Sequence, residues 1–218
     1  ISIAAIFGAT AVTGLLFAIA QGGGRLSLSI VTVLLVGIAI NALAGVGIGF
    51  FQYISDDSQL RTLTFWMMGS LGRADWTSLV AGIVLMLTGF CLLIQTHRQL
   101  DLLQLGEPEA EFMGVDVAYL KKQIVFASAL GVGAAVSLAG MIGFIGLVVP
   151  HLVRFLFGVT HRALMYGSAV VGASLLMLAD TIARITIPPA EIPVSLITSA
   201  IGAPFFLWLI VRDRRLWR

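Results

Sequence analysis

Residues 96–122 read THRQLDLLQLGEPEAEFMGVDVAYLKK and form the longest polar interruption in a chain that is otherwise almost entirely apolar. Four of the chain's eleven acidic residues fall within eleven positions of this stretch, and apolar side chains are threaded between them. Gly106 and Gly114 divide it into two pieces, each able to form a helix of a turn or two. On the residues alone, two interpretations stay open: a folded surface feature that another protein grips, and a solvated connecting loop.

The composition around this stretch sets the class of protein. Hydrophobic residues make up 59% of the chain and charged residues 11%, and the mean hydropathy is +1.03. Such a chain has too little polar surface to coat a soluble globule. A spanning helix needs about 20 apolar residues, so 218 residues hold about seven crossings. We therefore predict an all-α, polytopic membrane protein that forms a single domain over residues 1–218, with no nucleic-acid partner.

Seven apolar runs match this prediction, at 1–20, about 28–50, 77–95, 118–138, 139–157, 163–183 and 193–211. The fifth run is short and carries glycines and Pro150, so we expect a bent or re-entrant crossing there. A second polar interval, 53–76, surrounds an aromatic core of Phe65 and Trp66. The chain opens with neither an initiator Met nor a basic leader, so we expect that an N-terminal portion of a longer protein is missing.

The basic residues predict the orientation. If the seven runs alternate and the C-terminal tail is cytoplasmic, the outer side holds three basic residues, Arg61, Arg73 and Arg184. The cytoplasmic side then holds ten, namely Arg25, Arg98, Lys121, Lys122, Arg154, Arg162, Arg212, Arg214, Arg215 and Arg218. Because cytoplasmic loops of membrane proteins are enriched in Lys and Arg, this bias places 96–122 in the cytoplasm and 53–76 outside.

Several kinds of chemistry are missing from the sequence. It contains no GxxxxGK[ST] phosphate loop and no HExxH motif, and its histidines are scattered. We therefore assign no catalytic residue and no metal site, and expect any ATP hydrolysis to occur on a separate subunit. Two alternatives stay open, a stand-alone secondary transporter or channel and an intramembrane enzyme. The first would favour ionisable residues at mid-membrane, whereas the acids here fall in loops or at helix ends. The second needs a nucleophile–base pair that we do not find.

Several stretches, taken in order, carry a resemblance. They are FWMMGSL (65–71), LGE (105–107) with Ala110 and Gly114, GFIGLVVPH (143–151) with Arg154, AD (179–180) with Arg184, EIP (191–193), and IGAPF (201–205). In this order and spacing the chain resembles the permease subunits of type II ABC importers, which take up iron–siderophore complexes, haem and cobalamin across the bacterial inner membrane. Those permeases have ten spanning helices, so the chain resembles the last seven, together with the short cytoplasmic coupling helices.

The resemblance implies roles for particular residues. The positions matching the coupling helices that dock on the ATPase are Leu105, Gly106, Glu107, Ala110, Met113 and Gly114. Arg184 matches a position that pairs with an acid on the substrate-binding protein, although a local pair with Asp180 explains it equally well. The gate and the outer mouth of the pathway are matched by Ser29, Thr32, Trp66 and Gly69, with interfacial packing as the simpler explanation for the Trp66 patch. The residues assigned a structural role are Gly143, Gly146, Pro150, His151, Arg154, Gly202 and Pro204. His151 and Arg154 are expected to bond backbone groups freed at Pro150.

The same resemblance implies partners and a location. We expect a second copy of the permease, two ATP-binding-cassette subunits that carry ATP and Mg²⁺, a periplasmic substrate-binding protein and the lipid bilayer. The chain itself is expected to bind no cofactor. Its place is the bacterial inner membrane, as a multi-pass protein with a cytoplasmic C-terminus. The expected cargo is haem or an iron–siderophore chelate, with cobalamin as the alternative, and the expected mechanism is alternating access.

Overall fold

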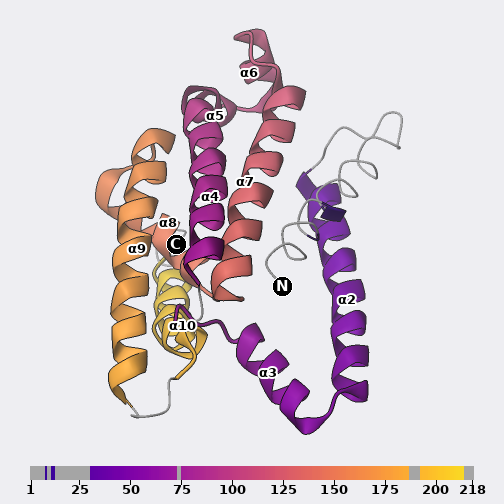
Figure 1. Cartoon of the computed structure of the whole chain (residues 1–218). Coiled ribbons are helices and arrows are strands. Elements are labelled where there is room, and N and C mark those ends of the chain that lie inside the picture. The colour runs from indigo at the N-terminus through magenta and orange to yellow at the C-terminus, as the bar shows by residue number, and fades with distance from the viewer. Residues whose placement is uncertain (1–7, 9–10, 13–29, 73–74, 187–191, 214–218) are drawn as a thin grey trace. The chain divides into compact units, whose positions relative to one another are not determined.

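The computed structural model describes residues 8, 11–12, 30–72, 75–186 and 192–213, and all regular structure within them is helical (Figure 1). This confirms the prediction of an all-α fold. The described helices are α2 (Ile30–Ile54), α3 (Asp57–Met67), α4 (Trp76–Gln95), α5 (His97–Leu103), α6 (Glu107–Phe112), α7 (Val117–Ala139), α8 (Ile145–Phe157), α9 (His161–Thr186) and α10 (Val194–Asp213).

Four of these helices are long and apolar enough to cross a membrane, namely Leu34–Ile54 within α2, and α4, α7 and α9. Two shorter apolar helices, α8 and the Val194–Leu209 part of α10, match the fifth and seventh predicted runs. The first predicted run, 1–20, lies almost wholly outside the described residues. Large apolar side chains are exposed along the long helices, for example Leu43 and Val46 on α2, which are both 71% exposed. A bilayer is the solvent that such surfaces require.

Contacts group the chain into two compact units, and the prediction of a single domain stays a prediction. Unit 1 comprises Ile1–Thr64 and Asp75–Leu138, and unit 2 comprises Phe65–Ala74 and Ala139–Arg218. In unit 1, α4 and α7 lie side by side (Figure 1). Gly82 faces Leu138, and Gly89 approaches the backbone of residues 127–131 so closely that a Cβ there would lie 2.8 Å from the Ala127 carbonyl oxygen. Small residues of this kind let helices in lipid pack backbone to backbone.

In unit 2, α8, α9 and α10 pack around small and β-branched side chains. Gly167 of α9 lies against Val153 of α8, which is fully buried. Ala179 and Ala183 of α9 form a buried cluster with Val194 at the start of α10. The absence of bulky side chains at these positions lets the helices approach closely.

A junction of backbone hydrogen bonds joins three segments of unit 2, and we call it the 69–140 junction. The Ser70 amide donates to the Ala139 carbonyl at 2.8 Å, and the Val194 amide donates to the Gly69 carbonyl at 3.3 Å. Gly69 and Gly140 have positive φ angles of 71° and 73°, which glycine adopts without steric cost. A Cβ on Gly140 would collide with the Trp66 carbonyl oxygen.

The helix break expected at Pro150 lies earlier in the chain. The helical path stops at Ala139 and resumes at Ile145, whereas Pro150 is inside α8. Phe144 begins α8 with a left-handed backbone (φ 65°), which is uncommon for a residue with a side chain. Its Cβ fills the space beside Gly202 of α10, and Thr198 Oγ donates to the Gly143 carbonyl at 3.1 Å. The interruption is therefore built from residues 140–144 and held by α10.

Candidate functional site

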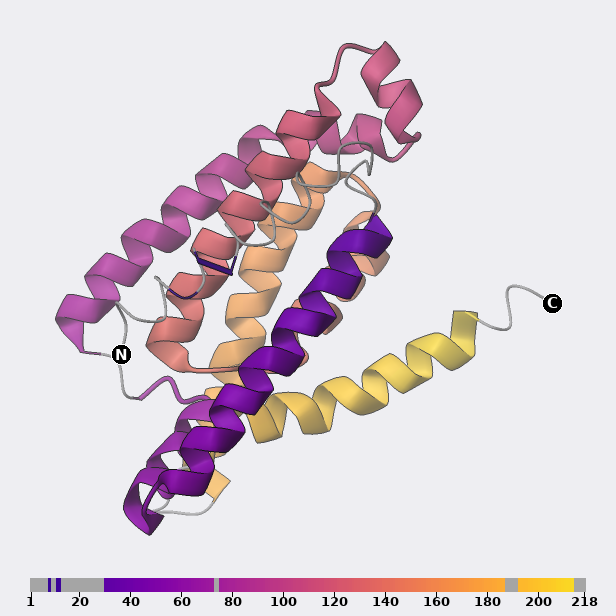
Figure 2. The same ribbon diagram turned by 90° about the vertical axis from the view of Figure 1, so that its right-hand side faces the viewer.

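The stretch 96–122 folds as two short helices at one end of the α4–α7 pair, as the glycine positions predict. Figure 2 shows α6 beyond the ends of the long helices α4 and α7. Gly106 precedes α6 with φ 124°, and Gly114 follows it with φ 87°. These values are open to glycine and strained for other residues, so both glycines set the direction of the chain. The two glycines therefore contribute to the site through their backbone conformation, which sets where α6 begins and where the chain turns toward α7.

The α6 helix is attached to the start of α7 through an apolar cluster. Ala110 is fully buried and packs with Val115, Val117 and Leu120, and the Val115 amide donates to the Ala110 carbonyl at 3.0 Å. Asp116 caps α7 by accepting the Tyr119 amide at 2.9 Å. This packing argues against the interpretation of 96–122 as a plain solvated loop, because a solvated loop would not bury these side chains.

An ion pair makes a second attachment. The Lys121 Nζ atom lies 2.7 Å from both carboxylate oxygens of Glu107. Lys121 is in the second turn of α7, and Glu107 is the first residue of α6. The carboxylate of Glu107 is thus engaged within the chain. Ala110 is buried, whereas the Glu107 side chain keeps 45% of its surface exposed, and the part of both in contact with a partner stays a prediction.

The outward side of α6 is apolar and exposed. Phe112 is 96% exposed, and a shallow hollow of about 580 Å³ is lined by Leu105, Pro108, Glu109, Phe112 and Met113. Sequence reasoning identified Leu105 and Met113 but missed Phe112, Pro108 and Glu109. The helical period offered a signal for Phe112, because a residue two positions after the buried Ala110 lies about 200° further around a helix, on the opposite face.

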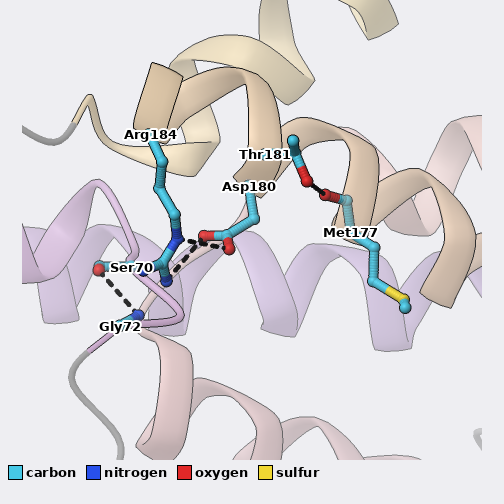
Figure 3. A network of polar contacts seen from close by, with 6 residues as sticks. All are labelled: Ser70, Gly72, Met177, Asp180, Thr181 and Arg184. Atoms are coloured by element: carbon cyan, nitrogen blue, oxygen red, sulfur yellow. Dashed lines mark hydrogen bonds and ion pairs between the residues drawn. The ribbon is translucent and has the colours of Figure 1, made fainter. Parts of the chain in front are cut away.

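A second group of predicted residues lies around the end of α9. Arg184 Nε donates to Asp180 Oδ2 at 2.8 Å and its amino group to Oδ1 at 3.5 Å, which confirms the predicted local pair. Figure 3 shows the Arg184 guanidinium directed toward the loop that carries Ser70 and Gly72. The Ser70 hydroxyl accepts the Gly72 amide at 3.3 Å. The second role of Arg184, docking of a binding protein, stays a prediction.

The residues assigned to the gate and outer mouth are only partly described. Ser29 lies outside the described residues, and Thr32 is in α2 with its side chain outside them. Trp66 is the last but one residue of α3, and its carbonyl accepts the Gly69 amide at 3.2 Å. Trp66 and Gly69 thus belong to the 69–140 junction, which supplies a structural explanation for both. Their role at the mouth of a pathway stays a prediction.

The glycines assigned a structural role divide into one that has no room for a side chain and two that have room for one. Gly202 is required by space, since a Cβ there would lie 2.6 Å from Phe144 Cβ, whereas a Cβ on Gly146 would meet no heavy atom within 4 Å. Gly143 has room for a Cβ, and its carbonyl is held by Thr198. Pro204, like Pro150, lies inside its helix.

His151 bonds a backbone carbonyl, as expected, but not the one that Pro150 leaves without a donor. A proline leaves the carbonyl four residues earlier without its helical donor, which for Pro150 is that of Gly146. His151 Nδ1 instead lies 2.8 Å from the Leu147 carbonyl oxygen, and its ring makes an edge contact with Phe206. The Arg154 carbonyl accepts the Gly158 amide at the end of α8. The structural role of His151 thus rests on Leu147 and Phe206, and the role expected of the Arg154 side chain stays a prediction.

The comparisons with known proteins agree with this architecture. The sequence profile of the FecCD transport family matches residues 1–212. The chain belongs to the FecCD transport family. Over 213 residues this FecCD chain is 48% identical to the hemin transport system permease protein of Yersinia pestis, covering 97% of the chain and 63% of that relative. It is 42% identical to the vitamin B12 import system permease protein of Vibrio vulnificus, covering 97% and 62%.

A solved structure gives the same fold. A metal-chelate type ABC transporter, described in an inward-facing conformation, superposes with a TM-score of 0.85 at 32% identity, covering 97% of the FecCD chain and 71% of the other. The FecCD chain spans 63% of the length of its hemin permease relative. Within the described part of the chain, no group of three or more His, Cys, Asp or Glu side chains could hold a metal ion.

Proposed function

We propose that the chain works as the permease subunit of an ATP-driven importer that moves haem across the bacterial inner membrane by alternating access. The observation that carries the proposal is the outward face of α6. A helix of six residues is far too short to be stable alone, yet α6 is held by a buried cluster and an ion pair. Leu105, Phe112 and Met113 at this helix are exposed on its surface.

This arrangement suits a contact with a soluble motor subunit. An exposed aromatic residue beside a shallow apolar hollow is the kind of anchor that dominates binding energy in protein–protein interfaces. The basic residues on the same side of the chain favour a cytoplasmic position for α5 and α6. We therefore assign the docking of the ATP-binding subunit to Leu105, Pro108, Glu109, Phe112 and Met113. ATP and Mg²⁺ belong to that subunit, and the chain itself needs no cofactor.

The cargo assignment rests on the relatives. The hemin permease shares 48% identity with this chain, and the vitamin B12 permease shares 42%. The apolar walls of the helices suit a bulky chelate that must pass without being held. We assign haem as the cargo and keep cobalamin as the competing outcome. A second permease copy and a periplasmic binding protein complete the transporter, with Arg184 as a docking residue for the latter.

Reconstitution of the full-length permease with its ATPase tests this function. Proteoliposomes loaded with ATP should take up hemin when the binding protein is present, and cyanocobalamin should not compete. Uptake of hemin without ATP would favour a stand-alone transporter. Uptake of cyanocobalamin and not of hemin would change the assigned cargo to cobalamin.

The docking assignment is tested by Phe112→Ala. Truncating an anchor residue typically costs about 2 kcal/mol or more of binding free energy. The affinity for the ATPase should therefore fall by roughly thirtyfold, and less ATPase should copurify with the permease. Tyr53→Ala is the matched control, since Tyr53 is 88% exposed and lies in the polar interval predicted to be outside. Equal ATPase binding by the Phe112→Ala variant and the wild type would remove α6 from the interface.

A further inference from the structure

The Lys121–Glu107 ion pair joins the start of α7 to the first residue of α6. Lys121 and Glu107 are fourteen positions apart, and the lysine side chain is only 19% exposed. Its ammonium lies 2.7 Å from Oε1 and 2.7 Å from Oε2, so it contacts both carboxylate oxygens at once. A partly shielded, two-oxygen contact is less screened by salt than a pair between fully exposed side chains.

The position of the pair complements the apolar cluster. Leu120, the neighbour of Lys121 on α7, is 1% exposed and packs with Ala110 in the body of α6. Lys121 contacts Glu107, at the first residue of α6. The cluster alone would let the short helix pivot about Ala110. An additional contact at the end of the helix removes that freedom.

We propose that Lys121 and Glu107 are positioning residues that make α6 and α7 move as one body. This inference rests on the proposed function, because it concerns how a displacement of α6 by the ATPase reaches the spanning helix α7. Glu107 acts through Lys121, and the outward contact is left to Phe112 and its neighbours. Loss of the pair would leave ATPase binding in place and weaken the transfer of movement.

The first test measures coupling in the reconstituted transporter, with hemin as the transported probe. Lys121→Met and Glu107→Gln should each lower hemin transported per ATP hydrolysed by roughly three- to tenfold. ATPase copurification should be unchanged, and Lys121→Arg should retain coupling. The double variant should be no worse than either single one, because both remove the same contact.

Matched controls separate the pair from charge loss in general. Lys122→Met removes an adjacent, exposed lysine, and Glu111→Gln removes an exposed acid from the same helix. Both should couple like the wild type. Coupling that falls equally in the controls, or that is unchanged in Lys121→Met, would overturn the inference while leaving the proposed importer intact. A wild-type permease that binds no ATPase would instead refute the proposed function.

A second test needs no transported substrate. Spin labels at Glu111→Cys on α6 and Val132→Cys on α7, with the exposed Cys91 changed to Ser, report the distance between the two helices. Double electron–electron resonance should give a distance distribution with one narrow peak in the otherwise wild-type full-length permease. Lys121→Met should lose the narrow peak, and Lys122→Met should keep it. Equal peak widths in all three proteins would show that the cluster suffices and the pair does not position α6.

Discussion

At the scale of single residues, the glycines of unit 2 divide into those that the backbone requires and those that it tolerates. Gly140 has a positive φ and faces the Trp66 carbonyl, whereas a Cβ on Gly146 meets only open space. Gly140, which precedes the GFIGLVVPH motif, is therefore more tightly constrained than Gly146 within the motif. The difference depends on a contact with Trp66 of α3, which the sequence does not display.

Gly140→Ala should destabilise the protein by about 2–4 kcal/mol, because the methyl group would occupy a strained backbone position and collide with a carbonyl oxygen. Gly146→Ala, within α8, should be neutral or slightly stabilising, since alanine favours a helix. Thermal unfolding of the detergent-solubilised protein compares the two. Similar midpoints for both variants would contradict the 69–140 junction.

Arg184 offers a second prediction at this scale. Its pair with Asp180 is a half-exposed i,i+4 contact within α9, which contributes little to stability. Arg184→Ala should therefore leave folding unchanged and weaken the salt-sensitive binding of the periplasmic protein by roughly tenfold. Surface plasmon resonance at two ionic strengths measures this, with Arg162→Ala at the opposite end of α9 as the control. Unchanged binding would restrict Arg184 to its local pair.

At the scale of elements, side-chain caps fix where helices begin. Asp75 accepts the Ser78 amide at 3.2 Å at the start of α4, and Asp56 accepts the Gln59 amide at 2.8 Å at the start of α3. Hydrogen bonds from the Ser78 side chain and then its amide lower the pKa of Asp75 below its ordinary value. Those from the Gln59 amide and then the Ser58 side chain lower the pKa of Asp56. The ionised form is the better cap.

The caps therefore predict an acid dependence. A carboxyl with a lowered pKa in the folded state contributes stability above its unfolded pKa and loses it as the pH falls through the folded value, here below about pH 4. The first turn of α4 should loosen on acidification in that range. Asp75→Asn keeps an acceptor that does not titrate, so its Ser78 amide resonance should not follow the acid transition seen in the wild type. Identical titrations would exclude Asp75 as the cause.

Much of the element order could be predicted from sequence. The apolar runs, the two glycines at 106 and 114, and the Asp180–Arg184 spacing predicted the long helices, the α5–α6 turn and the local pair, because each depends on neighbours in the chain. The exposure of Phe112 was missed although the helical period offered a signal for it. The pairing of Glu107 and the left-handed backbone of Phe144 escaped prediction because they depend on contacts with distant residues, Lys121 and Gly202.

At the scale of the whole molecule, orientation in the membrane follows from the distribution of Lys and Arg and is open to direct measurement. In a Cys91→Ser background, Glu111→Cys on α6 should be labelled by an impermeant maleimide only after cells are opened. Asp57→Cys at the start of α3 should be labelled in spheroplasts with intact inner membranes. Labelling in the reverse order would place α6 on the outer side and refute its docking to an ATPase.

The 69–140 junction also has a consequence for exchange with solvent. Ser70 lies outside any helix, in a segment where amides ordinarily lose their protons to water quickly. Its amide nevertheless ends on the carbonyl of Ala139 at 2.8 Å. We expect the Ser70 amide to exchange for deuterium as slowly as amides in the middle of α9. In a time course of deuterium labelling, this amide of an irregular turn should stay protected longer than amides at the ends of the surrounding helices.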